Sequence, residues 1–212
     1  MDGGCETCAI GRASAEGCPF HQLHWAAGTL LLRQGEVPNC VWYVRRGLVL
    51  VSSTTSAGDE TECGLRGPGA LVGIEALAQR PTGYEAWALS ELEACRVDSP
   101  SFRGWFGDVD TPAGVTALLA LDESERRRRE RVVLSGRTEE RVARFLVEHH
   151  RQQGAPLPIE QKILARMLGM QPETMSRALS KLRRVGALAA GRTLEVASLT
   201  ALQQVANGES PG

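Results

Sequence analysis

Residues 159–179 read IEQKILARMLGMQPETMSRAL, and this stretch decides the fold of the C-terminal part of the chain. Apolar residues recur at helical spacing on both sides of Gly169, a residue that permits a tight reversal. Pro172 suits the first turn of a helix because its φ is already close to the helical value. The pattern predicts helices over residues 159–168 and 172–185, joined as a helix-turn-helix.

The second of these helices is expected to have one apolar and one polar face. Met175, Leu179 and Leu182 follow the i, i+4, i+7 spacing of a buried stripe. The outward side chains suit contacts with bases and phosphates in the major groove. These candidate DNA-binding residues are Glu173, Thr174, Ser176, Arg177, Ser180 and Lys181. The alternative is an ordinary helical hairpin with a solvated, charged face.

The charge distribution separates the front of the chain from its back. The formal net charge is only −1, but residues 1–110 carry −6, residues 111–135 carry +1 and residues 136–212 carry +4. A concentration of basic residues is typical of a domain that meets a polyanion. The charge pattern therefore favours nucleic-acid binding by the C-terminal part.

Length and composition exclude several classes of protein. The chain has 212 residues, of which 42% are hydrophobic and 23% charged, an ordinary soluble composition. No apolar run approaches the roughly 18–20 residues of a membrane helix, and the first residues lack a signal-peptide pattern, so we expect a cytoplasmic protein. No nucleophile, phosphate-loop or paired-carboxylate motif indicates an enzyme.

The front half is predicted to form short strands separated by glycine turns. Apolar runs at residues 30–32, 41–44 and 48–51 lie within a strand-rich region, 24–106, which favours a small β-barrel or sandwich. Residues 1–19 carry three cysteines and little periodicity, and are expected to be a poorly structured arm.

Four further elements complete the predicted architecture. One long helix is expected over residues 112–134 and another over 138–151. Apolar residues alternate with other residues on either side of Gly191, which predicts a hairpin over 188–196. A short helix is expected after it, at about 198–206.

Both halves of the chain contain short distinctive motifs: RQGE at 33–36, YVRRG at 43–47, GPGALVG at 67–73 and ETMSR at 173–177. Together these motifs resemble those of the CRP/FNR family of bacterial transcription regulators. The resemblance covers nearly the whole chain. It implies a homodimer that reads a two-fold symmetric DNA site with TTGAT-like half-sites and works with RNA polymerase. By the same match Glu173, Ser176 and Arg177 would read the bases.

The resemblance also implies the fold and its division. We expect an α+β protein with a β-roll of the cyclic-nucleotide-binding jelly-roll type, a long dimerisation helix and a winged helix-turn-helix. The predicted parts are a cysteine-bearing arm (1–20), the β-roll sensor domain (21–110), the dimerisation helix (111–135) and the DNA-binding domain (136–212).

Four cysteines resemble the ligands of the FNR-type, oxygen-sensing branch of that family. They are Cys5, Cys8, Cys18 and Cys95, three in the arm and one in the roll. Such a set implies a [4Fe–4S] cluster that reports oxygen or redox state and controls dimerisation and DNA binding. Four soft thiolates satisfy a cluster of this kind, and Arg96 beside Cys95 favours the thiolate.

Other ligand sets remain open. Cys40 or Cys63 can replace Cys95, zinc can occupy the thiolates, or the cysteines can be core residues and free thiols. His21 and His24 are further candidate ligands of haem or another metal, although an incidental polar role competes with this.

A small molecule in the roll, a nucleotide or haem, is the alternative trigger. In members that bind cyclic nucleotides, Gly-Glu and Arg-Ser hold the ribose and phosphate. Here Gly73 is followed by Ile74 and then Glu75, and Tyr84-Glu85 takes the place of Arg-Ser. A carboxylate at the position of a phosphate contact disfavours a cyclic nucleotide.

The long helix is expected to supply the dimer interface, because two-fold operators match two-fold proteins. Its candidate interface residues are Val115, Leu118, Leu119, Asp122, Arg126, Arg129, Val132 and Val133. Charged residues within a helical seam cost stability, so we expect a marginal dimer that an intact cluster tips by a few kcal/mol. The alternative is a solvated helix surface with i, i+4 ion pairs.

Overall fold

The fold is described from a computed structural model, which covers residues 18–58, 60–106, 116, 120, 123, 135–154 and 156–209. The chain divides into two compact units, one built mainly of strands and one of helices, and each is described by itself. Among the described residues, none of the helices combines the length and apolarity that crossing a bilayer requires.

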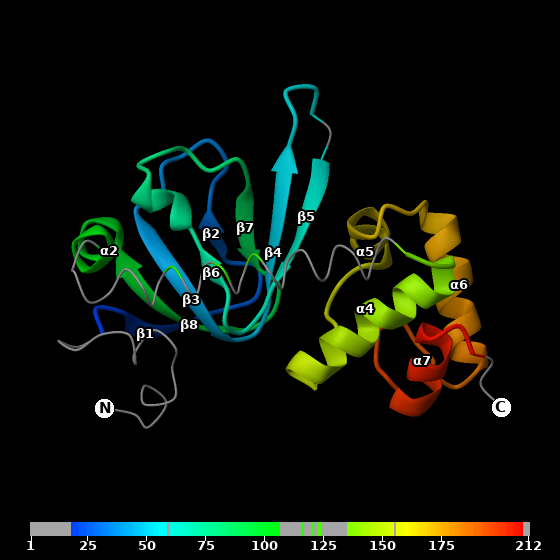
Figure 1. The fold of residues 1–212 in the computed structure, drawn as a ribbon. Helices are drawn as coiled ribbons and strands as arrows, with labels where there is room; N and C mark the ends of the chain where they lie inside the picture. Colours follow the sequence, from blue (N-terminus) through cyan, green and yellow to red (C-terminus); the bar gives the residue numbers. More distant parts are fainter. Residues whose placement is uncertain are drawn as a thin grey trace. The chain divides into compact units, whose positions relative to one another are not determined.

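Among the described residues, eight strands form two four-stranded sheets (Figure 1). One sheet has the order β1-β8-β3-β6 and the other the order β2-β7-β4-β5. The strands are β1 (His21–Trp25), β2 (Leu30–Leu32), β3 (Cys40–Arg46), β4 (Val49–Thr54), β5 (Glu60–Arg66), β6 (Leu71–Val72), β7 (Glu85–Ala88) and β8 (Leu92–Asp98).

The inner faces of the two sheets enclose one apolar core. Alternate residues of β3 and β8 point into it, among them Trp42, Val44 and Ala94. Val49 of β4 and Ala86 of β7 face them from the other sheet, and both are 0% exposed. The period of two along each strand explains this division of side chains between the two faces.

The outer face of β3 and β8 carries a second core, because two helical elements cover it. These are a 3-10 helix, η1 (Ile74–Leu77), and α2 (Ser99–Phe106). The ring centroids of Phe20 and Phe102 lie 5.8 Å apart, and Trp105 completes the aromatic group at 5.9 Å from Phe20. The predicted β-roll is confirmed, but sequence patterning predicts only strands here and misses both η1 and α2.

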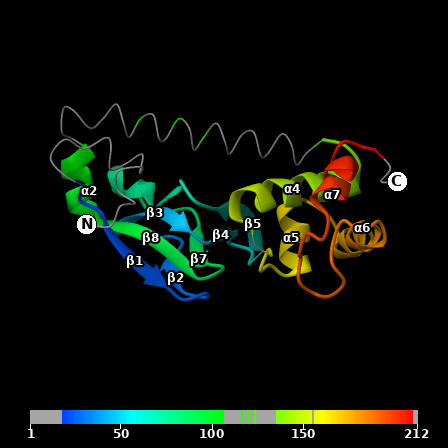
Figure 2. The same ribbon diagram turned by 90° about the horizontal axis from the view of Figure 1, so that it is seen from below.

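In the part of the second unit that the structure describes, there are four helices: α4 (Thr138–Gln153), α5 (Gln161–Met167), α6 (Pro172–Arg184) and α7 (Leu199–Ala206). Helix α4 packs against α6 and α7, and α5 packs against α6. Figure 2 shows α4 and α7 side by side. Leu146, Leu164, Met175, Leu179 and Leu202 are almost wholly buried between these helices. The predicted order of helices is confirmed, with ends that differ by a few residues.

The chain reverses at Gly191, as the alternating pattern predicts. Leu188 and Val196 form an antiparallel bridge, and the Ala189 N–H donates to the Glu195 carbonyl at 3.0 Å. The reversal consists of isolated bridges instead of two full strands. A segment before α5 joins it, because Leu157 bridges Leu194, and this third partner is absent from the sequence prediction.

The long helix predicted over residues 112–134 lies mostly outside the described residues. Thr116, Ala120 and Glu123 are its described positions, and all three are helical.

Candidate functional site

Helix α6 exposes a polar face because its apolar residues are buried inside the helical unit. Met175, Leu179 and Leu182 are 0% exposed and Ala178 is 5% exposed, which confirms the predicted buried stripe. Pro172 opens the helix, after Gln171 in an extended conformation. The turn before it bends at Gly169, whose φ of +59° is easily adopted by glycine.

The predicted DNA-binding residues lie along the opposite side of α6. Glu173, Ser176, Arg177 and Ser180 are exposed, and Thr174 is half-buried. Within the described part of the chain, neither the Glu173 carboxylate nor the Arg177 guanidinium forms a hydrogen bond or ion pair, so both side chains are available to bases. Guanine O6 and N7 suit the Arg177 guanidinium, and cytosine N4 suits the Glu173 carboxylate.

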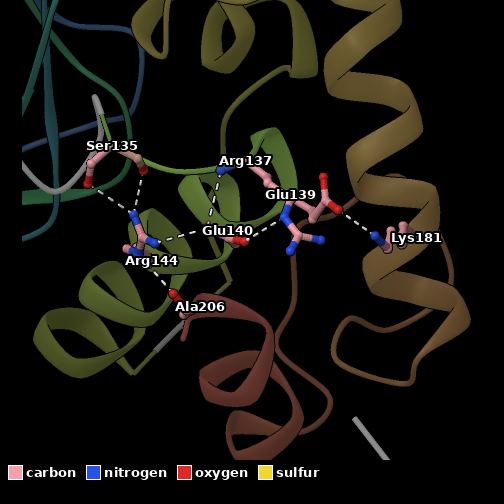
Figure 3. Close-up of polar contacts among 7 residues, drawn as sticks. All are labelled: Ser135, Arg137, Glu139, Glu140, Arg144, Lys181 and Ala206. Carbon is pink, nitrogen blue, oxygen red and sulfur yellow. Dashed lines mark hydrogen bonds and ion pairs between the residues drawn. The ribbon is translucent and has the colours of Figure 1, made fainter. Parts of the chain in front are cut away.

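Lys181 differs from the other members of this set. Its side chain is exposed, but its ammonium group forms an ion pair with Glu139 of α4 (Figure 3). The Lys181 bond lowers the pKa of Glu139, which therefore stays ionised at neutral pH. An intramolecular partner for Lys181 is not foreseen by the sequence.

A network around Arg144 holds the start of the helical unit together (Figure 3). The guanidinium donates to the Ala206 carbonyl at 2.8 Å, to the Ser135 hydroxyl at 3.2 Å and to Glu140 at 3.2 Å. Glu140 in turn accepts from the Arg137 backbone N–H at 3.2 Å. The network ties α4, the end of α7 and the segment that enters the unit into one arrangement.

Gly136 lies directly over this network. Its φ is +91°, and a Cβ there would lie 2.5 Å from a Glu140 carboxylate oxygen and 2.9 Å from Arg144 Nη2. A residue other than glycine would therefore meet both backbone strain and a collision. The sequence signal that points to this network is Glu140 four residues before Arg144, the spacing of a helical ion pair.

Arg141 supports the helix-turn-helix from the same helix. One of its guanidinium nitrogens donates to the Leu168 carbonyl, at the end of α5. The first two turns of α4 thus contact the turn of the motif through Arg141 and the recognition helix α6 through Glu139.

Two of the four predicted cluster ligands lie on the same face of the roll. Cys95, in β8, is 7% exposed and belongs to the outer core with Phe20 and Phe102. Cys18 is half-buried and packs against that same core. Cys5 and Cys8 lie outside the described residues.

Cys40 lies on the other face of the same sheet. It is 3% exposed within the inner core, next to Trp42 and Val44. Its thiol donates to the Asn39 side-chain oxygen at 2.9 Å, and burial raises its pKa, so the neutral thiol is favoured. The side chain of Cys63 lies outside the described residues. No group of three or more candidate metal ligands occurs among the residues that the structure describes.

His21 and His24 occupy the exposed edge strand β1, on which successive side chains point to opposite faces. Their odd spacing puts them on opposite faces. His24 Nε2 lies 3.9 Å from a Glu93 carboxylate oxygen.

A hydrogen-bonded group occupies the part of the roll where the sequence departs from cyclic-nucleotide binders. The Tyr84 hydroxyl donates to Glu75 at 3.0 Å and accepts from the Gly73 backbone N–H at 3.4 Å. Burial and the Glu75 charge raise the pKa of Tyr84 to about 12. Ser52 donates to Glu85 at 3.2 Å. The Gly73 N–H and both carboxylates are thus engaged by the protein's own side chains.

The predicted dimer interface lies outside the described residues. This applies to every residue assigned to it: Val115, Leu118, Leu119, Asp122, Arg126, Arg129, Val132 and Val133.

Comparison with known proteins identifies both units. Residues 22–108 match the cyclic nucleotide-binding domain, and residues 140–205 match the Crp-like helix-turn-helix domain. The transcriptional activator protein Anr of Pseudomonas aeruginosa is 28% identical over 197 residues, covering 87% of this chain and 80% of its own length. The transcriptional activator protein FnrA of Stutzerimonas stutzeri is 28% identical, with 85% and 78% covered.

Solved structures share the fold. FixK2 from Bradyrhizobium japonicum superposes with a TM-score of 0.72 at 22% identity, covering 91% of this chain and 98% of that one. A CRP-family transcriptional regulator from Thermus thermophilus, TTHB099, gives a TM-score of 0.73 at 23% identity, with 90% and 98% covered.

Proposed function

The chain belongs to the CRP/FNR family of transcription regulators, and from this premise we propose that it senses oxygen or redox state through a cysteine-bound [4Fe–4S] cluster. It is a DNA-binding regulator and not an enzyme, with α6 as its recognition helix. The proposed ligands are Cys5, Cys8, Cys18 and Cys95, and the integrity of the cluster controls dimerisation and DNA binding.

The observation that carries this proposal is the common location of two sulfurs. Cys18 and Cys95 are far apart in the sequence but pack against one apolar core on the outer face of the roll. The pairing of β1 with β8 brings them there, because Gln22 lies opposite Cys95 and Cys18 precedes β1 by only a few residues. Cys40 faces the opposite side of the sheet, which favours Cys95 over Cys40 as the ligand from the roll.

The donor set fits the proposed group chemically. Soft thiolates are the ligands that iron–sulfur clusters take, and an apolar surrounding controls solvent access to such a site. When bound, the cluster supplies a centre that oxygen or other oxidants destroy. The protein's own contribution is to hold Cys95 on a rigid central strand, while Phe20 anchors the cysteine-bearing segment to α2 through the aromatic group.

A nucleotide in the roll is the weaker candidate trigger. A bound phosphate needs free N–H donors and positive charge. The Gly73 N–H already meets the Tyr84 hydroxyl, and the nearby Glu75 and Glu85 carboxylates would repel an anion.

The DNA target is proposed from the recognition helix. Glu173, Ser176 and Arg177 are exposed in the order of the family's base-reading motif, so we propose TTGAT-like half-sites in a two-fold symmetric operator. One α6 reads too few base pairs for a specific site, which supports a homodimer as the binding form. RNA polymerase is the proposed partner on the promoter.

The experiment is purification without oxygen, followed by visible absorbance and assays of iron and acid-labile sulfide. We expect a coloured protein with equal amounts of iron and sulfide. Cys18→Ala and Cys95→Ala should each lose the colour, whereas Cys40→Ala, a control at a buried cysteine on the other face of the sheet, should retain it. Circular dichroism establishes that each variant is folded.

Two results would contradict the proposal. One is a wild-type protein that stays colourless after reconstitution with iron and sulfide. The other is loss of colour in Cys40→Ala with retention in Cys95→Ala. DNA binding driven by an added cyclic nucleotide in the colourless protein would support a roll ligand instead.

A further inference from the structure

The ion pair between Lys181 and Glu139 lies beside the surface that reads DNA. Lys181 follows Arg177 by one helical turn on α6, and both side chains are exposed. Glu139 belongs to the first turn of α4, and its carboxylate accepts a hydrogen bond from the Lys181 ammonium (Figure 3). Glu139 is less accessible than its partner, with side-chain exposures of 20% and 53%.

We infer that Glu139 takes the place of a DNA phosphate at Lys181 and thereby limits the attraction of α6 for DNA of any sequence. A carboxylate and a phosphate oxygen both accept charge-assisted hydrogen bonds from an ammonium group. An ammonium group that is already neutralised inside the protein gains little from a phosphate, and it releases no counterion when the protein meets DNA.

The neighbouring residues make Glu139 a fixed acceptor. Glu140, next to it, bonds the Arg137 backbone N–H and the Arg144 guanidinium, so the first turn of α4 is held from both sides. The backbone that carries Glu139 is thus anchored, whereas Lys181 reaches the carboxylate at the end of a long, flexible side chain. Arg177 has no such acceptor in the described part of the chain, and its charge remains available to DNA.

The consequence concerns how the protein separates its target from other DNA. Phosphate contacts carry no sequence information, whereas base contacts do. Because Glu139 neutralises the Lys181 ammonium group, that group contributes little to binding the DNA phosphates, and the sequence-independent part of the binding free energy is smaller. Base contacts made near the start of α6 then account for a larger share of the total binding free energy. Glu139 is thus a positioning residue that acts through Lys181.

The test measures how DNA affinity depends on salt concentration. Full-length protein, prepared without oxygen, is titrated onto two duplexes, one of random sequence and one that the protein selects from a random library. Glu139→Gln should raise the affinity for random DNA several-fold and steepen the slope of log affinity against log salt by about 0.9 for each Lys181 that is freed.

Three further variants make the result specific to this pair. Lys181→Gln alone leaves the Glu139 carboxylate unpaired beside the DNA and should therefore weaken binding to random DNA. The double variant Glu139→Gln/Lys181→Gln replaces a neutral pair with two neutral side chains, so its salt slope should return to the wild-type value. Glu160→Gln is the matched control: it removes one exposed carboxylate from the same unit, at the start of α5, where Glu160 makes no side-chain capping bond. It should leave the slope unchanged.

Two outcomes would overturn the inference. A flatter salt slope in the double variant than in the wild type would mean that Lys181 contacts phosphate in the wild-type protein. A gain of the same size in Glu160→Gln would mean that Glu139 acts only through the general charge of the surface. Thermal melting is recorded for each variant, and if Glu139→Gln does not fold, the slope of the double variant decides.

Discussion

The recognition helix and the cysteine region of the roll are built in contrasting ways. On α6 the buried stripe and the polar face come from one run of 13 residues, so helical periodicity alone separates them. In the roll, Cys18 and Cys95 come from opposite ends of the domain, and the pairing of β1 with β8 places both against one apolar core. A local motif can be interpreted from its spacing, whereas a composite site depends on strand order.

The largest expected effect tests the composite site. On the proposed mechanism, exposing the anaerobically prepared protein to air should abolish DNA binding and shift it from dimer to monomer, because a marginal dimer would lose the contribution of the proposed cluster. Sedimentation velocity and gel-shift titration, before and after exposure, measure the change. If the dimer fraction is the same before and after exposure to air, the proposed cluster does not control dimerisation.

The next effect tests the inner face of α6. Leu179→Ala removes a side chain that is 0% exposed and should cost about 2–5 kcal/mol of unfolding free energy, because it leaves a cavity between helices. Urea denaturation measures this cost. Ser180→Ala, at the adjacent exposed position, serves as the control and should shift stability by less than about 0.5 kcal/mol.

A smaller effect tests the outer face of the same helix. Arg177→Ala should cost about 1–3 kcal/mol in binding to the selected operator and relax the preference for guanine, without lowering stability. Gel-shift titrations on operators with single base changes measure the preference. Equal weakening on all sequences would show that Arg177 contacts only phosphate.

The smallest effect concerns α7, the last helix of the helical unit. The Ser198 hydroxyl caps α7 by accepting from the Ala201 N–H at 3.2 Å. Ser198→Ala should therefore destabilise the protein by about 1 kcal/mol. Chemical denaturation reports the loss, and Ser198→Asp, which retains a capping oxygen, should recover most of it.

The DNA-binding unit was largely predictable from the sequence, for a definite reason. The helix-turn-helix relies on contacts between residues a few positions apart, and on Gly169 and Pro172 at positions that suit their backbone preferences. Its long-range features were not predictable. The Glu139–Lys181 pair, the Arg144 network and the Leu157–Leu194 bridge all join segments whose approach no local pattern encodes.

The sequence by itself determined the family motifs, the apolar run at the centre of β3 and the polar face of α6, because periodicity and residue type are properties of neighbouring positions. Only the tertiary structure decided three features: which cysteines share a face of the roll, that the Tyr84 hydroxyl forms hydrogen bonds with Glu75 and the Gly73 N–H, and that α2 covers the outer core. Each of these depends on which strands pair and in what register. A shift of one residue in β8 would move Cys95 to the inner face and leave its neighbours outside.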